Sequence, residues 1–539
     1  MRSSRRISSR TRIASTGSNN TQRMSTRKEF GDWQTPIGLA KRVAALVKEL
    51  YGQPRCVVEP TCGIGTFLIA SREEWGGQVK YQGYEVNSNY VDEAREKLGS
   101  DGVEILQCDF FGEDWSANIG GLNMDRVLII GNPPWITNSE LGQLGSSNLP
   151  AKTNFQGLRG FEARTGKSNF DIAEWMLIRL IEALPEGGAM AMLCKTMTAR
   201  KVLKHLWKTD NAKEGAYLFH IDAQADFGVA VDACLFFITG KRASTRIATM
   251  FSDLDITSSS KRFGYVGGDL VSDMDAYEQS RVLDGGCSSY VWRSGVKHDA
   301  AKVMEFTLDG STLINGLGER VDIEEDYVFP LLKSSDLGNG RGEIRKAVLV
   351  TQRRTGDDTS EIAHAAPKTW AYLLKHASAL DERGSSIYED RPRFSVFGIG
   401  SYSFAPWKVA ISGLYKQTSF MLVPPVAGRP VMVDDTCYSI PCKTQAEAEF
   451  LVELLNSGPA QEFLNSLIFF DAKRPITIDV LRRLSFVELA RKLDRIEALR
   501  NFVEPVSVGE SGAVQMSLLM EPEPVSNAKR PRRTTTAQA

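Results

Sequence analysis

Four apolar runs in the first quarter of the chain each end in a polar side chain. The polar residues are Glu59, Glu85, Asp109 and Asn132, which lie 26, 24 and 23 residues apart. Each interval has room for one strand, one helix and two loops. The pattern predicts a parallel sheet whose strands place these side chains along one edge, where ligands bind in open α/β folds.

The same rhythm continues to about residue 245. Residues 38–51 have apolar positions at helical spacing, and residues 170–184 predict a second apolar helix. Strands are predicted at 188–193 and 233–238. A long polar loop at 136–168 is interpreted as a lid over the substrate, with a surface insertion as the alternative.

Beyond residue 245 the pattern changes to short β-rich segments between Gly, Ser and Asp turns, with helical spacing again at 446–455 and 460–468. Basic and aromatic residues interleave in this region. The interleaved segments are 352–354, 402–408, 415–416 and 469–475. Their Lys and Arg side chains can contact DNA phosphates or guanine edges, although most residues of this kind are ordinary surface.

Composition narrows the class of protein. A chain of 539 residues with 42% hydrophobic content predicts two or three domains with buried cores. No apolar stretch approaches the ~18 residues of a membrane span, and no signal peptide is recognisable. Eight separate cysteines and five scattered histidines predict a reduced, cytosolic protein without a metal site. The acidic residues form no pattern that indicates a fused nuclease.

Charge is unevenly distributed along the chain. Residues 1–28 carry +8 and residues 528–539 carry +4, so the net charge of −1 leaves −13 on the rest. Both ends are rich in polar residues and are predicted to be disordered. They attract DNA phosphates or are simply solvated ends, and the sequence leaves both interpretations open.

The loop at residues 131–135 reads Gly-Asn-Pro-Pro-Trp and suits a planar ring that bears an NH2 group. The Asn132 side-chain oxygen can accept one amine hydrogen, and the Pro133 carbonyl can accept the other. Prolines stiffen the loop, and Trp135 offers a flat face for stacking. The loop alone is equally compatible with a Pro-Pro turn that packs a tryptophan.

Residues 59–67, Glu-Pro-Thr-Cys-Gly-Ile-Gly-Thr-Phe, predict a glycine-rich turn that leads into a helix. Glycine lets the backbone approach a ligand closely, and the helix N-terminus adds N–H donors. Glu85 follows Gly65 by 20 residues, the offset at which dinucleotide-type folds place a carboxylate on ribose hydroxyls. The strand ends therefore predict one site for a cofactor and an amine.

Together these motifs resemble the S-adenosylmethionine-dependent DNA amino-methyltransferases, specifically the gamma-class adenine-N6 enzymes of restriction-modification systems. The resemblance is specific over about residues 29–240 and looser to about 490. It implies an α/β fold, with a Rossmann-like methyltransferase domain around a mostly parallel seven-stranded sheet and a C-terminal mixed α+β target-recognition domain. The implied boundaries are a disordered basic tail at 1–28, the methyltransferase domain at 29–245, the DNA-binding target-recognition domain at 246–505 and a disordered tail at 506–539.

The resemblance also assigns site residues. Binding of S-adenosyl-L-methionine is expected from Thr35, Pro36, Glu59, Thr61, Gly63, Gly65, Phe67, Glu85, Asp109 and Phe110. The catalytic loop is Asn132, Pro133, Pro134 and Trp135. Contacts with the target base or DNA are expected from Phe227, Lys152, Arg159 and Lys195, and core packing is equally compatible with Phe227. Residues 329–336, Phe-Pro-Leu-Leu-Lys-Ser-Ser-Asp, resemble a segment common in target-recognition domains.

The implied function is methylation of the exocyclic N6 of adenine in duplex DNA by the modification enzyme of a restriction-modification or phage-defence system. A separately encoded restriction endonuclease is the implied partner, and the implied location is the bacterial cytoplasm, at the nucleoid. Cytosine-N4 methylation is the nearest alternative, although that subclass tends to use serine at the position of Asn132. A glutamine-N5 protein methyltransferase shares the loop but usually lacks such a long C-terminal region. Intact Asn132, Glu85 and Asp109 argue against a catalytically silent recognition subunit.

Overall fold

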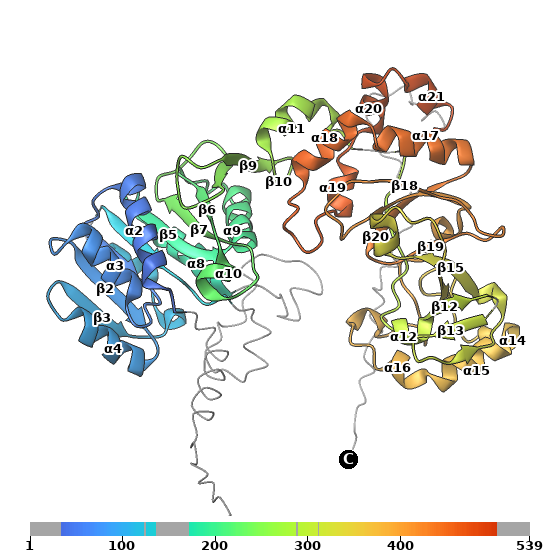
Figure 1. Cartoon of the computed structure of the whole chain (residues 1–539), viewed down its shortest axis with the longest axis horizontal. Coiled ribbons are helices and arrows are strands. Elements are labelled where there is room, and N and C mark those ends of the chain that lie inside the picture. The colour runs from blue at the N-terminus through green and yellow to red at the C-terminus, as the bar shows by residue number, and fades with distance from the viewer. Residues whose placement is uncertain (1–33, 123–124, 136–171, 287–288, 311, 504–539) are drawn as a thin grey trace, which may run out of the picture. The chain divides into compact units, whose positions relative to one another are not determined.

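A computed structural model of the chain describes residues 34–122, 125–135, 172–286, 289–310 and 312–503. Its largest feature is a ten-stranded sheet in the order β10-β9-β8-β6-β7-β5-β4-β1-β2-β3 (Figure 1). The strands are β1 Cys56–Glu59, β2 Lys80–Glu85, β3 Val103–Gln107, β4 Val127–Gly131, β5 Ala189–Lys195, β6 Tyr217–Ile221, β7 Ala233–Thr239, β8 Ile247–Phe251, β9 Ser260–Val266 and β10 Asp269–Val271.

The first seven strands confirm the predicted, mostly parallel sheet. β1 lies between β2 and β4 and is parallel to both, β3 is parallel to β2, and β5 is parallel to β4. Only β7 runs against its neighbours β5 and β6. Because β1 to β5 all run in one direction, the residues that follow them lie along one edge of the sheet.

The sheet continues past residue 245. β8 is parallel to β6, and β9 and β10 extend the sheet in antiparallel fashion. These three strands belong to the segment that the sequence analysis assigns to the target-recognition domain. The domain boundaries themselves stay predictions.

Helices cover both faces of this sheet (Figure 1). One face is covered by α2 Ile37–Tyr51, α3 Thr66–Trp75 and α4 Ser88–Leu98, and the other by α5 Trp115–Gly120, α8 Ile172–Ala183 and α9 Thr196–Lys208. Successive strand residues alternate between the two cores, as the pleat requires: Leu128 and Ile130 face the first set of helices, and Ile129 faces the second. A short helix, α10 Ala223–Phe227, precedes β7.

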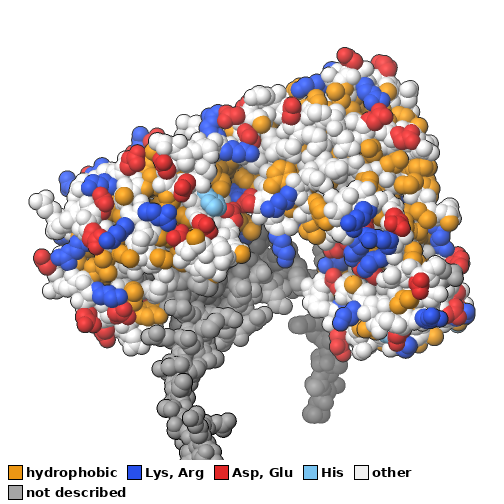
Figure 2. Space-filling model, in the orientation of Figure 1, with side chains coloured by type: hydrophobic (Ala, Val, Ile, Leu, Met, Phe, Trp, Pro, Cys, Tyr) orange, Lys and Arg blue, Asp and Glu red, His pale blue; other side chains and the backbone are white. Residues whose placement is uncertain are grey.

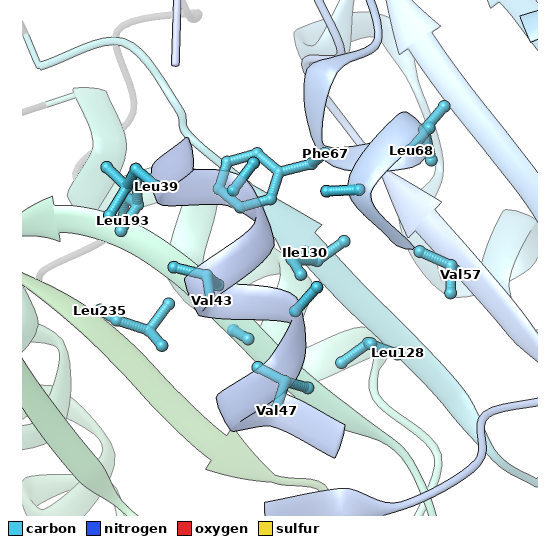
Figure 3. Close-up of a cluster of buried hydrophobic side chains, with 14 of the residues drawn as sticks. Leu39, Val43, Val47, Val57, Phe67, Leu68, Leu128, Ile130, Leu193 and Leu235 are labelled. Atoms are coloured by element: carbon cyan, nitrogen blue, oxygen red, sulfur yellow. The ribbon is translucent and has the colours of Figure 1, made fainter. Parts of the chain in front are cut away.

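Helix α2 explains how one of these cores forms. Leu39, Val43 and Val47 are spaced four residues apart, so they share one face of the helix. Figure 3 shows this face against Leu128 and the neighbouring strands. Pro36 is the N-cap of this helix, and its carbonyl accepts the N–H groups of Leu39 and Ala40 at 3.0 and 3.1 Å.

Beyond α11 Met274–Ser280, the chain forms two smaller sheets with short helices, a mixed α+β arrangement. One sheet has the order β11-β20-β17-β18 and the other β14-β13-β12-β16-β15-β19. Their strands are β11 Arg293–Ser294, β12 Glu305–Asp309, β13 Thr312–Asn315, β14 Arg320–Val321, β15 Val328–Leu332, β16 Lys346–Leu349, β17 Trp407–Ser412, β18 Met421–Val423, β19 Met432–Val433 and β20 Cys437–Cys442.

Short helices also occur in the chain beyond α11. They are α12 Ala301–Met304, α13 Ser334–Gly338, α14 Ile362–Ala365, α15 Pro367–Lys375, α16 Ala377–Asp381, α17 Gln445–Leu455, α18 Gly458–Leu467, α19 Ile478–Arg482, α20 Phe486–Lys492 and α21 Ile496–Arg500. Single 3-10 turns are η1 Phe110–Gly112, η2 Arg281–Leu283, η3 Glu325–Tyr327, η4 Ser386–Tyr388 and η5 Ser401–Phe404. Helices α17 and α18 match the helical spacing predicted at 446–455 and 460–468.

One basic residue in the interleaved segments is not on the surface. Lys408 in β17 is 2% exposed, and its ammonium donates to the Ala405 carbonyl at 2.8 Å. Burial lowers the pKa of Lys408 to about 8. This lysine is therefore not available to nucleic acid, contrary to the expectation for residues 402–408.

In the described ranges, no helix combines the length and the apolar character that crossing a bilayer requires. The same ranges hold no group of three or more His, Cys, Asp or Glu side chains arranged to bind a metal ion. The cysteines in these ranges are free thiols.

Candidate active site

The glycine-rich turn after β1 is held by the acid at the end of β2. One carboxylate oxygen of Glu85 accepts the Gly63 N–H at 2.9 Å, and the other accepts the Asn87 N–H at 2.9 Å. Gly63 and Gly65 have φ angles of +51° and +81°, which side chains rarely adopt. Gln34 packs over the turn, since a Cβ on Gly63 would lie 2.8 Å from its Nε2. Gln34, the residue before Thr35, is thus in close contact with the turn.

Glu59, at the end of β1, lies beneath this turn. It is 3% exposed, and its carboxylate accepts the Leu68 N–H at 3.3 Å. Burial raises the pKa of the Glu59 carboxyl well above its ordinary value, the Leu68 N–H opposes this, and the charge of Glu85 adds to it. A Cβ on Gly131 would approach Glu59 Cγ to 3.3 Å, so the acid also supports the backbone beside Asn132.

Asp109 and Phe110 follow β3. Asp109 is exposed, and its side chain caps η1 by accepting the Phe111 N–H at 3.0 Å. Phe110 is 6% exposed and packs on Trp115, with ring centroids 4.7 Å apart. The acid is accessible to a ligand, whereas Phe110 lies mostly in a core. Phe67 is likewise buried, at 1% exposure, among the residues of Figure 3.

The loop after β4 meets the N-terminal segment. The Asn132 amide nitrogen donates to the Thr35 hydroxyl at 3.3 Å, although 97 positions separate the two residues. A buried Thr35 therefore orients the Asn132 amide. Pro133 is buried and Pro134 half-buried in the same loop.

Three residues predicted to contact the target base come together. The rings of Trp135 and Phe227 lie 5.2 Å apart at 66°, edge to face. The Lys195 ammonium donates to the Trp135 carbonyl at 2.8 Å. Trp135 is 7% exposed and Phe227 half-buried, so Phe227 is the more accessible ring.

The buried Thr61 hydroxyl and the buried Trp135 indole N–H lie at this edge and have no hydrogen-bond partner among the described residues. Buried polar groups are nearly always satisfied, so a ligand is a reasonable partner for them. Together with the glycine turn, the Thr61 hydroxyl makes the residues after β1 a suitable cradle for a cofactor.

Not every predicted residue can be located. Lys152 and Arg159 lie outside the described residues, as do the whole loop predicted at 136–168 and both predicted tails. Conversely, three exposed apolar side chains near the strand ends were not predicted: Val86 (41% exposed), Met197 (49%) and Val231 (39%). Val86 directly follows Glu85. An apolar residue immediately after a strand-end acid is the sequence signal that could have predicted this exposed side chain.

The chain was compared with known proteins. No family model matches it. The type II methyltransferase M.NspV from a Nostoc species is 44% identical over 471 residues, which are 86% of this chain and 98% of that protein.

Solved structures were also compared. The type IIL restriction-modification enzyme MmeI, solved in complex with DNA, has a TM-score of 0.49 at 15% identity, with 88% of this chain and 67% of that chain covered. The type IIG restriction endonuclease BpuSI has a TM-score of 0.35 at 13% identity, with 87% and 61% covered. These structural likenesses are too weak to add to the sequence relationship.

Proposed function

This chain belongs to the type II methyltransferases, and on that premise we propose that it methylates the exocyclic N6 of adenine in duplex DNA with S-adenosyl-L-methionine as the methyl donor. Its biological role is then the modification step of a restriction-modification system, beside a separately encoded endonuclease. The observation that carries the proposal is the Asn132 loop at the end of β4, on the same sheet edge as Glu85 and Asp109. An amide acceptor beside a cofactor cradle suits transfer to an amine.

The cofactor is assigned to the ends of β1, β2 and β3. Gly63 and Gly65 let it approach the backbone, Thr61 offers a buried hydroxyl, and the carboxylates of Glu85 and Asp109 are acceptors for hydroxyl and amino groups. When bound, S-adenosyl-L-methionine supplies a methyl group made electrophilic by its sulfonium sulfur. The role of the protein is to hold the amine in position and to exclude competing acceptors.

The amine is activated by two acceptors in the proposed mechanism. An aromatic NH2 group is a poor nucleophile, because its lone pair is delocalised into the ring. Hydrogen bonds from its two N–H groups to the Asn132 side-chain oxygen and the Pro133 carbonyl favour a tetrahedral nitrogen with a localised lone pair. The Thr35 hydroxyl fixes the Asn132 amide, so the acceptor is preorganised. Positioning supplies most of the remaining acceleration.

An adenine inside a duplex cannot reach this edge, so the target nucleotide must leave the helix. The flipped base needs a stacking partner. Phe227 is the more accessible ring, and Trp135 supports it from the core at 5.2 Å. Lys195 holds the loop through the Trp135 carbonyl.

Asn132 is the main reason to favour adenine over cytosine-N4, since an amide rather than a hydroxyl stands at the start of the loop. A glutamine-N5 protein methyltransferase would leave the two C-terminal sheets without a role. A recognition subunit without catalytic activity is disfavoured. Such a subunit would not need an exposed Asp109 at the cofactor site or an Asn132 amide fixed by Thr35.

The test is to incubate the protein with methyl-labelled S-adenosyl-L-methionine and long mixed-sequence duplex DNA, digest the DNA and identify the labelled nucleoside. We expect N6-methyl-2′-deoxyadenosine. Asn132→Ala should lower turnover at least ~100-fold, as loss of one preorganised charge-stabilising group does, and leave cofactor binding near normal. Asp109→Ala should show the converse, with weaker cofactor binding as its main defect.

If the label is found in N4-methylcytosine, the protein methylates cytosine N4, the nearest alternative, and the adenine proposal is wrong. No label in any DNA, from protein that binds the cofactor, would refute the enzymatic proposal. Near-normal turnover by Asn132→Ala would refute the mechanism while leaving the reaction in place.

A further inference from the structure

Three segments far apart in sequence meet around Arg353 in the C-terminal region. The Arg353 guanidinium carbon lies 5.3 Å from the ring centroid of Phe329 in β15 and 4.5 Å from that of Phe404 in η5. The two rings are 5.4 Å apart at 70°. The Arg429 guanidinium lies 4.9 Å from the Phe329 centroid. Two arginines therefore share one aromatic platform, which is called the Phe329 platform below.

The turn that carries Arg353 is firmly held. Gln352 is 4% exposed; its amide nitrogen donates to the Asp357 carbonyl at 2.6 Å, and its oxygen accepts the Val396 N–H at 3.0 Å. The Arg354 N–H donates to the Asp357 carboxylate at 2.7 Å. The backbone on both sides of Arg353 is thus fixed, and its side chain is exposed.

Arg353 forms no ion pair with any residue that the structure describes. The nearby acids are otherwise engaged: Asp357 accepts a backbone N–H, and Asp358 accepts the N–H and the hydroxyl of Ser360. Arg393 is different, because it pairs with Asp381 at 2.6 Å while it lies over Phe394. Both arginines stack on rings, but among the described residues Arg353 lacks the carboxylate partner that Arg393 has.

We propose that the Phe329 platform presents Arg353 and Arg429 to the backbone phosphates of DNA. A guanidinium offers a fork of donors that matches a phosphate, and one that already rests on a ring loses less freedom on binding. Phosphates receive most protein–DNA hydrogen bonds. Figure 2 shows Lys and Arg side chains gathered on this region, near the positions of β15 and β19 in Figure 1. The inference rests on the proposed function, which supplies DNA as the partner.

The experiment measures the affinity of the full chain for a fluorescent mixed-sequence duplex across a series of salt concentrations. Arg353→Ala should weaken binding about fivefold near 0.1 M salt and reduce the slope of log K against log salt by about 1. The loss should be equal for duplexes of unrelated sequence. Arg353→Lys, which keeps the charge, should retain the slope. Arg393→Ala is the matched control and should bind like the wild type.

An unchanged slope in Arg353→Ala would overturn the proposal. A loss confined to one DNA sequence would also overturn it, because that result assigns Arg353 to a base edge. Circular dichroism establishes that each variant is folded, and if Arg353→Ala is not, Arg353→Gln replaces it. Methylation by the wild type is assayed in parallel, so that failure of the proposed function is seen separately from failure of the phosphate surface.

Discussion

At the scale of single residues, the sequence predicts where Glu59 lies in the fold but not whether its carboxyl is protonated. The sequence predicts its place at the end of a strand, and the structure confirms that place. Its protonation is a different matter, because it depends on the turn and the backbone at Gly131 that enclose it. Burial raises the pKa of its carboxyl, so the acid keeps its proton above the pH at which an exposed glutamate releases it.

We expect Glu59→Gln to gain stability relative to the wild type as the pH rises. The unfolded chain releases the proton near pH ~4.3, whereas the folded protein retains it to a higher pH, so wild-type stability falls between those two values. Glutamine is neutral throughout, and its oxygen can still accept the Leu68 N–H. Thermal unfolding between about pH 5 and pH 8 measures this. A difference in Tm that does not grow with pH would show that Glu59 is ionised in the folded protein.

At the scale of elements, Arg200 on α9 joins the large sheet to the segment at 469–475. Its side chain is 6% exposed, forms a bidentate pair with Asp471 and lies 3.7 Å from Asp232. The Phe469 ring centroid is 4.4 Å from its guanidinium carbon. Burial opposes ionisation of Asp471, but Arg200 holds its pKa low, while burial and the adjacent Asp471 raise the pKa of Asp232.

Arg200→Met should therefore destabilise the protein by about 3 kcal/mol, the lower part of the range for a broken buried ion pair, because both carboxylates are about one-third exposed. Arg246→Met is the matched control, since Arg246 pairs with Asp210 at 3.0 Å on the surface. It should cost less than about 1 kcal/mol. The urea midpoints of the two variants measure the difference, and equal midpoints would mean that Arg200 contributes little.

Elements also show how far the sequence predicts the fold. The strands that end at Glu59 and Glu85, and the strand directly before Asn132, were predicted, because each has its own apolar run followed by a polar residue. Strands β8 to β10 were not predicted as part of the sheet, since their pairing with β6 depends on contacts remote in sequence. The burial of Lys408 has the same cause, because β17 lies between β18 and β20.

The same limit applies to the candidate site. The spacing of residues along the sequence predicts which residues stand at the strand ends. It does not predict contacts between residues that are far apart in the sequence. The Asn132 amide meets Thr35 across 97 positions, and Arg353 meets Phe329 and Phe404 only in the folded chain. No local pattern encodes either contact.

At the scale of the whole molecule, the distribution of charge sets the conditions for binding DNA. The chain outside residues 1–28 and 528–539 carries −13, so a duplex approaching it meets an acidic body. Binding then depends on local groups of cations, such as the Phe329 platform, and on the +12 carried by the two ends. These two sources can be separated by substitution, because the charges of the two ends and those of the platform belong to different parts of the sequence.

Replacing the twelve Lys and Arg residues of the two ends by Gln or Ser separates the two sources while keeping the chain length. The net charge becomes −13, so we expect weaker binding and slower association with mixed-sequence duplex at low salt. The difference should shrink as salt rises, because charges separated by more than the Debye length of about 10 Å at 0.1 M are screened. Turnover at saturating DNA should stay at the wild-type level, since the ends contain none of the residues assigned to the site.

Stopped-flow anisotropy and methylation assays at two salt concentrations measure both quantities. Unchanged association rates at low salt would make the ends solvated segments without a role in DNA capture, and a fall in saturated turnover would place them in the reaction itself.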